Sequence, residues 1–294
     1  MRNLIFAVLF ILSGDCFSQN VPPRLTMEWE VLAEHLVGQL DLQPGERFMA
    51  VAHPGLFDDL IPHLRYEVMK ARGVDLGVID VLAEPVSELW NTTVLRDGSR
   101  AARQALAEML ENVDASIMLP GANPGHPVYA AIQDNLRKGI GRTIHFHWLQ
   151  NGSAYTLPGQ PLPPLHLVEA TYQQALLQAD YEALAAHQRR FEQAMRDGEV
   201  RVTSAAGTDL RFRIGNRPVN FQDGDASAVR AERGVILIDR EIELPAGAVR
   251  VAPLEDSVSG TIAFPPSQWS GKAVTGLKLT FEAGNVVDVI AESG

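Results

Sequence analysis

Two histidines with a spacing of two are the first residues in the sequence that could do chemistry. His145 and His147 stand in the apolar run 142–148 (RTIHFHW), and on a strand their side chains would share one face. Two imidazoles on one face could hold a metal ion, but this run has no carboxylate to complete a ligand set. We therefore expect a hydrogen-bonded pair at the end of a strand. None of the eight histidines forms an H-E-x-x-H pattern or another close metal-ligand spacing on a helix.

Two loops could bind a substrate. His53-Pro54-Gly55 follows an apolar run at 47–52, and the segment 120–126 (PGANPGH) follows another at 115–119. If both runs are parallel strands, these loops stand at their carboxyl ends, where open α/β sheets bind ligands. His53, Asn123 and His126 are therefore candidate substrate-binding residues, although ordinary Pro/Gly turns are the simpler interpretation.

Adjacent carboxylates stand at two further places. Glu255 and Asp256 lie in the segment 254–260 (LEDSVSG), between two β-like runs. They suit a hard cation or a hydrogen-bonded turn, and their spacing favours the turn. For Asp223 and Asp225 we expect a solvated loop, because two carboxylates without a histidine or a third acid do not make a metal site. The sequence has no Walker-type phosphate loop, no G-x-G-x-x-G after a strand and no G-x-S-x-G nucleophile elbow.

The elements that must position these residues change in type along the chain. The pattern predicts strands at 47–52, 75–81, 115–119 and 142–148, and helices at 27–40, 56–72, 99–112 and 128–138. Strands that read as continuous apolar runs between helices indicate a parallel α/β sheet. A proline-rich connector at 157–164 and two helices at 167–178 and 180–196 follow. The remainder has short β-like runs at 200–203, 209–214, 235–242, 249–253, 259–264, 277–281 and 286–291. The predicted fold is thus an α/β domain at 19–197 and a mostly β domain at 198–294.

The first 18 residues resemble an export signal. A short positive start precedes the apolar run 4–12, and small and polar residues follow it. This run is about half the length of a membrane-spanning helix, so we expect cleavage before Gln19 and an exported, periplasmic or secreted protein without a stable membrane span. The alternative is a lipid on Cys16, which Asp15 disfavours.

The composition excludes several partners. The chain has 294 residues, with Lys+Arg 25 against Asp+Glu 36 and a net charge of −11. Such an acidic chain without a basic block is a poor candidate for binding nucleic acid or anionic membranes. Its single cysteine excludes disulfides within the chain.

The second half of the chain resembles the M29 family of metallo-aminopeptidases, the aminopeptidase T or thermophilic aminopeptidase group. The resemblance is carried by the segments 199–207 (EVRVTSAAG), 208–224 (TDLRFRIGNRPVNFQDG) and 244–262 (LPAGAVRVAPLEDSVSGTI), and extends more loosely through the first half. It implies an α/β domain followed by a domain with a two-metal centre holding zinc, cobalt or manganese. It also implies a peptide substrate and a homodimer.

The sequence departs from the family at one metal ligand. In active members a glutamate follows Pro-Ala-Gly, and here Ala248 takes that place; the family's other ligands would lie after Gly294. No metal ligand can therefore be assigned, and Glu255 and Asp256 match only a segment of unknown role. Three functions stay open: a metallo-aminopeptidase whose ligands come from a further part, an inactive member that binds a peptide or small molecule, and a metal-dependent dioxygenase of the related dihydroxypyridine-cleaving type.

Overall fold

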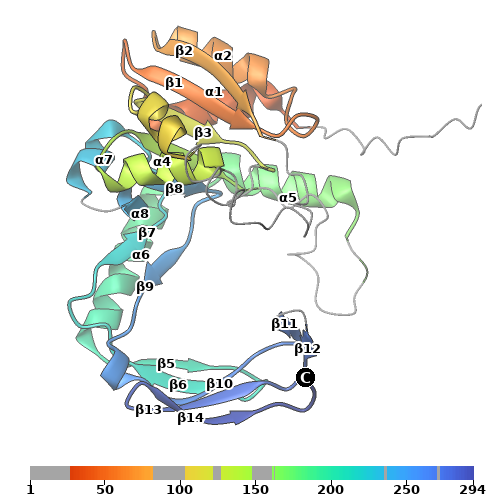
Figure 1. The fold of residues 1–294 in the computed structure, drawn as a ribbon, viewed down its shortest axis with the longest axis vertical. Helices are drawn as coiled ribbons and strands as arrows, with labels where there is room; N and C mark the ends of the chain where they lie inside the picture. The colour runs from red at the N-terminus through yellow and green to blue at the C-terminus, as the bar shows by residue number, and fades with distance from the viewer. Residues whose placement is uncertain are drawn as a thin grey trace, which may run out of the picture.

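The structure is a computed structural model of the chain (Figure 1). It describes residues 27–81, 103–121, 127–147, 161, 163–234, 237–269 and 272–294. The predicted signal peptide at 1–18, most of the connector at 157–164, and the candidates Asn123 and His126 lie outside the described residues.

The first half of the chain builds a five-stranded parallel sheet, as predicted. Its order is β2 (Val74–Asp80), β1 (Arg47–Ala52), β3 (Ala115–Met118), β4 (Arg142–Phe146) and β8 (Glu241–Leu244), and every neighbouring pair is parallel. Strand β3 is buried along its whole length. The continuous apolar runs of the inner strands follow from this burial on both faces.

Helices cover both faces of this sheet. Alternate residues of β1 enter two cores: Phe48 and Ala50 pack on one face, and Met49 and Val51 on the other. The helices of the first core are α1 (Trp29–Leu40), α2 (Ile61–Lys70) and α5 (Leu165–Leu177). Those of the second are α4 (Pro127–Arg137) and the helical residues 103–110.

One β-like run was placed in the wrong sheet. The prediction gave a strand at 235–242 within the β-rich part, but the short helix α8 (Leu237–Arg240) precedes β8, which pairs with β4 of the first sheet. Ile242 and Leu244 of β8 are buried in the first core. The chain therefore returns to the parallel sheet after residue 198, and the domain boundary near residue 197 stays a prediction.

The second sheet is antiparallel, which confirms the predicted change of architecture. Its order is β14 (Asn285–Ile290), β13 (Lys278–Glu282), β10 (Ser259–Ala263), β6 (Asp209–Phe212) and β5 (Val200–Thr203). A further two-stranded pair, which the sequence pattern did not predict, consists of β11 (Ser267–Trp269) and β12 (Lys272–Val274). Such three-residue strands are too short to show an alternating pattern.

A long helix and a pair of short strands join the two sheets (Figure 1). The helix is α6 (Tyr181–Asp197), and the strands are β7 (Val219–Phe221) and β9 (Val249–Val251), which pair antiparallel. The Asp180 carboxylate caps α6 by accepting from the Ala183 amide at 2.9 Å. At the other end, Arg196 donates to the carbonyl of Gly215 at 2.6 Å. Two short helices complete the described elements, α7 (Ala228–Arg233) and the 3-10 turn η3 (Glu255–Ser257). Among the described residues, none of the helices has the length and apolar character needed to cross a membrane.

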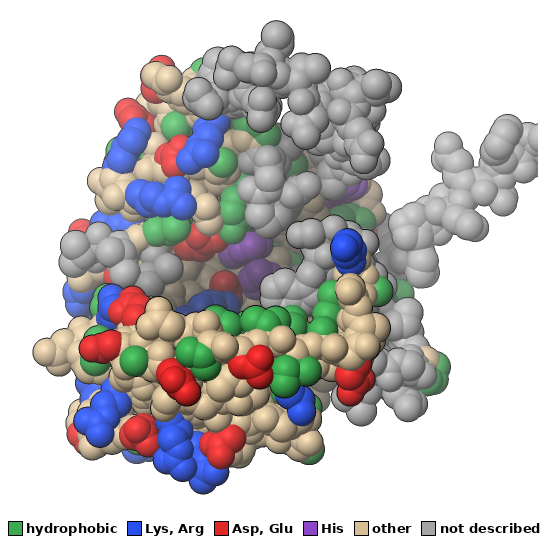
Figure 2. All heavy atoms as spheres, turned by 60° about the horizontal axis from the view of Figure 1, so that its bottom comes forward, with side chains coloured by type: hydrophobic (Ala, Val, Ile, Leu, Met, Phe, Trp, Pro, Cys, Tyr) green, Lys and Arg blue, Asp and Glu red, His purple; other side chains and the backbone are tan. Residues whose placement is uncertain are grey.

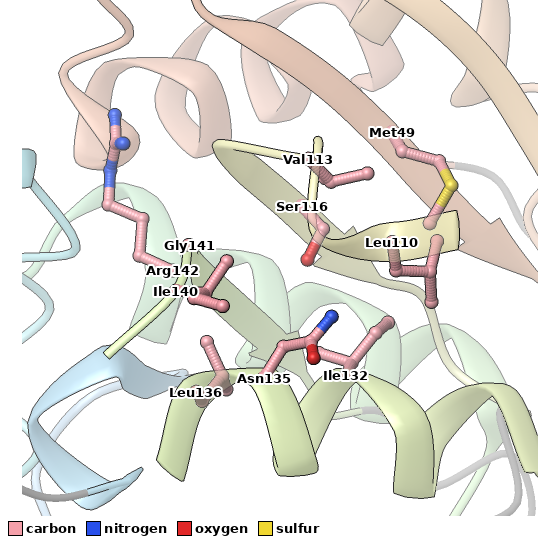
Figure 3. A pocket seen from close by; sticks show the side chains of 10 residues that line it. All are labelled: Met49, Leu110, Val113, Ser116, Ile132, Asn135, Leu136, Ile140, Gly141 and Arg142. Carbon is pink, nitrogen blue, oxygen red and sulfur yellow. The ribbon is translucent and has the colours of Figure 1, made fainter. Parts of the chain in front are cut away.

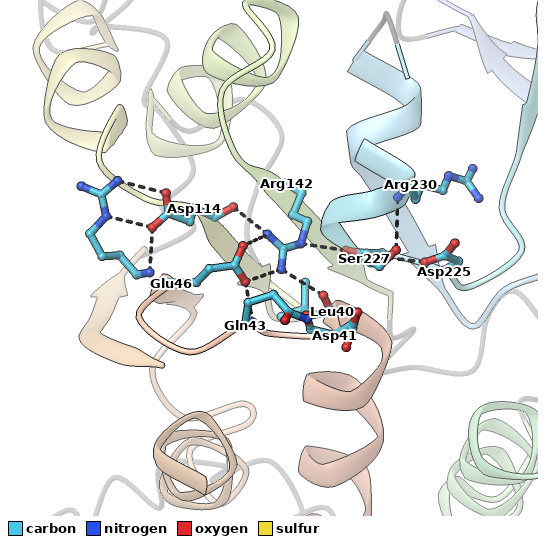
Figure 4. Close-up of polar contacts among 11 residues, drawn as sticks. Leu40, Asp41, Gln43, Glu46, Asp114, Arg142, Asp225, Ser227 and Arg230 are labelled. Carbon is cyan, nitrogen blue, oxygen red and sulfur yellow. Dashed lines mark hydrogen bonds and ion pairs between the residues drawn. The ribbon is translucent and has the colours of Figure 1, made fainter. Parts of the chain in front are cut away.

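A buried arginine ties the amino ends of the parallel strands together (Figure 4). Arg142, only 4% exposed, donates to both carboxylate oxygens of Glu46 at 2.7 Å. It also donates to the carbonyls of Leu40 at 3.0 Å, Ala226 at 3.0 Å and Asp114 at 3.4 Å. These contacts compensate the buried charge, because a guanidinium removed from water must have its donors satisfied.

A cavity of about 10 Å³ lies between the sheet and α4 (Figure 3). Met49, Leu110, Ser116 and Asn135 are among its lining residues. The buried Oδ1 of Asn135 has no hydrogen-bond partner among the described residues. A space of this size fits one water molecule, so the cavity has a structural role and cannot hold a substrate.

Candidate functional site

A cluster of ionisable side chains lies around the pairing of β4 and β8, with His145 and His147 at the carboxyl end of β4. We call it the histidine–glutamate cluster, and its members are Tyr129, His145, His147, Glu241, Glu243 and Arg250. The carboxyl ends of parallel strands are where open α/β sheets bind ligands.

Strand alternation explains why these residues meet. In the β4–β8 register, Thr143 is opposite Glu241 and His145 is opposite Glu243. The residues between them on each strand are apolar and enter the first core. The polar residues of both strands therefore point to the other face of the sheet, toward α4 and its Tyr129.

The inner half of the cluster is a hydrogen-bonded group of three. The Tyr129 hydroxyl donates to Glu241 at 2.8 Å, and the Nδ1 of His145 lies 3.3 Å from the Tyr129 oxygen and 3.5 Å from Glu241. Because a hydroxyl has one proton and Tyr129 gives it to Glu241, the Nδ1 of His145 must be the donor in its contact with the phenol oxygen.

The outer half of the cluster combines three charged or chargeable side chains. The Glu243 carboxylate accepts from Arg250 through one oxygen, and its other oxygen lies 3.7 Å from the Nε2 of His147. The two imidazole rings link the halves, with centroids 4.0 Å apart and planes tilted by 32°. Each histidine of β4 is thus next to one glutamate of β8.

Hydrogen bonding keeps both carboxylates ionised. Contacts with His147 and Arg250 lower the pKa of Glu243 to about 2 despite its partial burial. Burial alone would raise the pKa of Glu241, but hydrogen bonds from His145 and Tyr129 outweigh it and lower that pKa. Burial and the nearby Glu241 raise the pKa of Tyr129, so the phenol remains a donor.

The cluster opens toward solvent at its outer end. The side chains of His145 and Glu241 are 14% and 12% exposed, whereas those of His147 and Arg250 are 46% and 52% exposed. Figure 2 shows a hollow in the surface whose floor carries histidine, acidic and basic side chains next to one another. Within the cluster, the exposed outer half is the part that a ligand from solvent would meet.

Ala248 lies close to the outer half of the cluster, because Gln222 forms hydrogen bonds with both Ala248 and Glu243. The side chain of Gln222 accepts from the Glu243 amide at 2.6 Å, and its backbone amide donates to the Ala248 carbonyl at 2.9 Å. Gln188 of α6 donates to the same carbonyl at 3.3 Å. Ala248, which the resemblance aligns with a metal-binding glutamate, is therefore linked to Glu243 through Gln222, and it offers only a methyl group and a carbonyl oxygen that is already bonded.

The donor set does not fit a metal centre. Within the described part of the chain, no group of three or more His, Cys, Asp or Glu residues is arranged to hold a metal ion. Glu241 and Glu243 contact Tyr129 and Arg250, respectively. His145 is hydrogen-bonded to Tyr129, and His147 lies 3.7 Å from Glu243; we derive no metal-dependent step from these residues.

The other predicted site residues lie elsewhere. His53 follows β1 and its Nδ1 bonds to the Pro54 carbonyl at 2.9 Å; a Cβ on Gly121 would stand 2.7 Å from the Cβ of His53. The loops after β1 and β3 are therefore adjacent, as expected for neighbouring parallel strands. Glu255 pairs with Arg217 in an exposed 3-10 turn, and Asp256 belongs to the same turn. Their role as metal ligands stays untested.

The expected solvated loop at Asp223 was wrong. Its carboxylate is 7% exposed and accepts from the guanidinium of Arg230, which is 8% exposed. Asp225 instead caps the turn before α7 by accepting from the Ser227 amide at 3.0 Å. Asp223 and Asp225 look equivalent in the sequence. They differ in burial only because α7 packs over Asp223 and brings Arg230 to its carboxylate.

The two glutamates of the cluster were not predicted from the sequence, because Glu241 and Glu243 are about a hundred residues away from His145 and His147. The alternation E-I-E-L at 241–244 does match H-F-H at 145–147 in period, but the run was assigned to the other sheet. Recognising that β8 joins β4 would have brought the four side chains together.

Comparisons with known proteins found one family that matches the C-terminal part of the chain and one solved structure with a similar fold. Residues 172–294 match the family described as thermophilic metalloprotease (M29). The structure is similar to that of wild-type AmpT from Thermus thermophilus, with a TM-score of 0.58 and 20% sequence identity, over 90% of this chain and 72% of AmpT. At this identity the similarity establishes the fold. No curated protein matches the chain.

Proposed function

We propose that the protein binds peptides with a free amino terminus in the hollow of Figure 2, without metal-dependent hydrolysis, because residues 172–294 match the family described as thermophilic metalloprotease (M29). The proposed absence of metal-dependent hydrolysis rests on Ala248, which stands where the resemblance places a metal-binding glutamate. Its methyl group cannot ligate a cation, and its carbonyl accepts hydrogen bonds from Gln222 and Gln188.

Peptide binding is supported by the match of residues 172–294 to this family and by the place of the histidine–glutamate cluster. Glu241, Glu243 and Arg250 all lie within the matched residues. Glu243 stands on β8 next to the carboxyl end of β4, Arg250 stands on β9, and the outer half of the cluster is accessible from solvent. Ionised carboxylates at this place favour a ligand with an ammonium group over an acidic one.

Hydrolysis and binding can be separated on the purified chain. We expect L-alanyl-L-alanine to bind with one site per chain, and an aminoacyl chromogenic amide to remain intact with zinc, cobalt or manganese. Turnover together with about two tightly bound metal ions per chain would establish the metallo-aminopeptidase and contradict our proposal. Iron-dependent oxygen consumption with an aromatic diol would instead establish the dioxygenase.

We also infer that the protein is exported, which is supported by the sequence of residues 1–18. The charged start, the apolar run and the small residues before Gln19 follow the order of a secretory signal. Intact mass measurement of the protein recovered from the outer cell fractions tests this. The expected mass is that of a chain beginning at Gln19, and a retained amino terminus or a lipid on Cys16 would contradict it.

A further inference from the structure

The ion pair of Glu243 and Arg250 has an unusual setting for a surface pair. It stands at the open end of the histidine–glutamate cluster, with side-chain exposures of 24% and 52%. A carboxylate and a guanidinium are thus presented side by side to the hollow. Exposed ion pairs contribute little to stability, so a ligand can replace this contact at small cost.

A molecule complementary to this pair must carry a positive and a negative group next to each other. A free α-amino acid has its ammonium and its carboxylate on the same carbon atom, whereas in a dipeptide a peptide unit separates them. We propose that Glu243 and Arg250 bind the ammonium and carboxylate groups, respectively, of a free α-amino acid.

The chemistry of both side chains suits these two roles. Glu243 stays ionised far below neutral pH, because hydrogen bonding lowers its pKa to about 2. A guanidinium has five N–H donors in a planar fork, which matches a carboxylate. The exposed imidazole of His147, next to Glu243, adds a further polar group at the same rim.

The backbone holds both residues in place. The Glu243 amide donates to the side chain of Gln222 at 2.6 Å. Arg250 is paired with Asn220 in the β7–β9 ladder, and Gln222 follows Asn220 by two residues. The segment 220–222 therefore contacts the backbone of both charged residues, and a preformed site loses less entropy on binding.

This inference goes beyond peptide binding and needs no hydrolysis by the chain. Its ligand is a single amino acid, the class of compound that a peptidase releases. Binding of L-alanyl-L-alanine tests the proposed function, and binding of L-alanine tests the amino-acid site. Either proposal can therefore be refuted without refuting the other.

Three ligands on the wild-type chain test the site without any substitution. L-alanine carries both charges, L-alaninamide only the ammonium group, and N-acetyl-L-alanine only the carboxylate. By titration calorimetry or ligand-observed NMR we expect L-alanine to bind about tenfold or more tightly than either analogue, since each lacks one charge-assisted contact. Equal affinity for all three, or no binding of L-alanine, would overturn the proposal.

Substitutions then assign each charge to its residue. In Arg250→Gln, L-alanine and L-alaninamide should bind equally; in Glu243→Gln, L-alanine and N-acetyl-L-alanine should bind equally. The matched control is Arg217→Gln, which removes an arginine from the exposed pair with Glu255 and should leave all three affinities unchanged. A preference for L-alanine that survives both cluster variants would place the ligand elsewhere and refute the assignment.

Discussion

The buried guanidinium of Arg142 holds several segments at the amino ends of the parallel strands, and its replacement by methionine should destabilise the protein strongly. Methionine keeps much of the apolar stem but donates no hydrogen bond. The change would leave the Glu46 carboxylate, now 19% exposed, and the carbonyls of Leu40 and Ala226 without this donor. Breaking a buried pair by removing one partner costs about 3–5 kcal/mol.

The assay is equilibrium unfolding in urea, followed by circular dichroism and checked by thermal unfolding. We expect the free energy of unfolding to fall by about 3–5 kcal/mol, which corresponds to a decrease in Tm of about 6–20 °C for a structure of this size. The m-value should not change, because the surface exposed on unfolding stays the same.

A neighbouring pair supplies the control. Arg47 also begins a parallel strand and contacts Asp114 through two nitrogens, at 2.8 and 3.0 Å, but the two side chains are 39% and 35% exposed. Arg47→Met should therefore change the free energy of unfolding far less than Arg142→Met does. If Arg142→Met costs no more than Arg47→Met, then burial of the Arg142 network does not decide its contribution and our reasoning is refuted.

Two further predictions concern the cluster and the second sheet. The lowered pKa of Glu243 stabilises the folded state above pH 4.5, the ordinary pKa of a glutamate, and this stabilisation is lost as the pH falls toward 2. The difference in the free energy of unfolding between wild type and Glu243→Gln should therefore shrink over that range in acid titrations. A constant difference would contradict the lowered pKa. Gly260 has φ +101°, and a Cβ there would stand 2.2 Å from the Asp209 carbonyl, so Gly260→Ala should lower Tm. The matched control Gly38→Ala, in α1 with no atom within 4 Å of the added Cβ, should add roughly 0.5–1 kcal/mol, and equal effects would be inconsistent with the clash.

Local sequence patterns predicted most elements well, because burial leaves a simple periodic signal. The strand 47–52 coincides with β1, where five of the six residues are buried. The helix 128–138 agrees with α4 within one residue, since its apolar residues recur on one face. The change from parallel to antiparallel architecture also followed from the disappearance of helical runs after residue 198.

The candidate site could not be predicted in the same way, because it depends on pairing between distant strands. The histidines at 145 and 147 were recognised, but the glutamates at 241 and 243 joined them only through the β4–β8 register. Residue type and local period say nothing about which sheet a four-residue strand enters. The buried state of Asp223 was missed for the same reason, because its partner Arg230 comes from a helix that packs over it.

The central claim is that the hollow binds peptides with a free amino terminus while Ala248 excludes the family's hydrolytic chemistry. The most direct measurement is a titration of the purified chain with L-alanyl-L-alanine, with and without zinc, while released alanine is measured in the same samples. Our account predicts saturable binding, no requirement for zinc, and recovery of the dipeptide intact. Release of alanine that depends on zinc bound to the chain would contradict it.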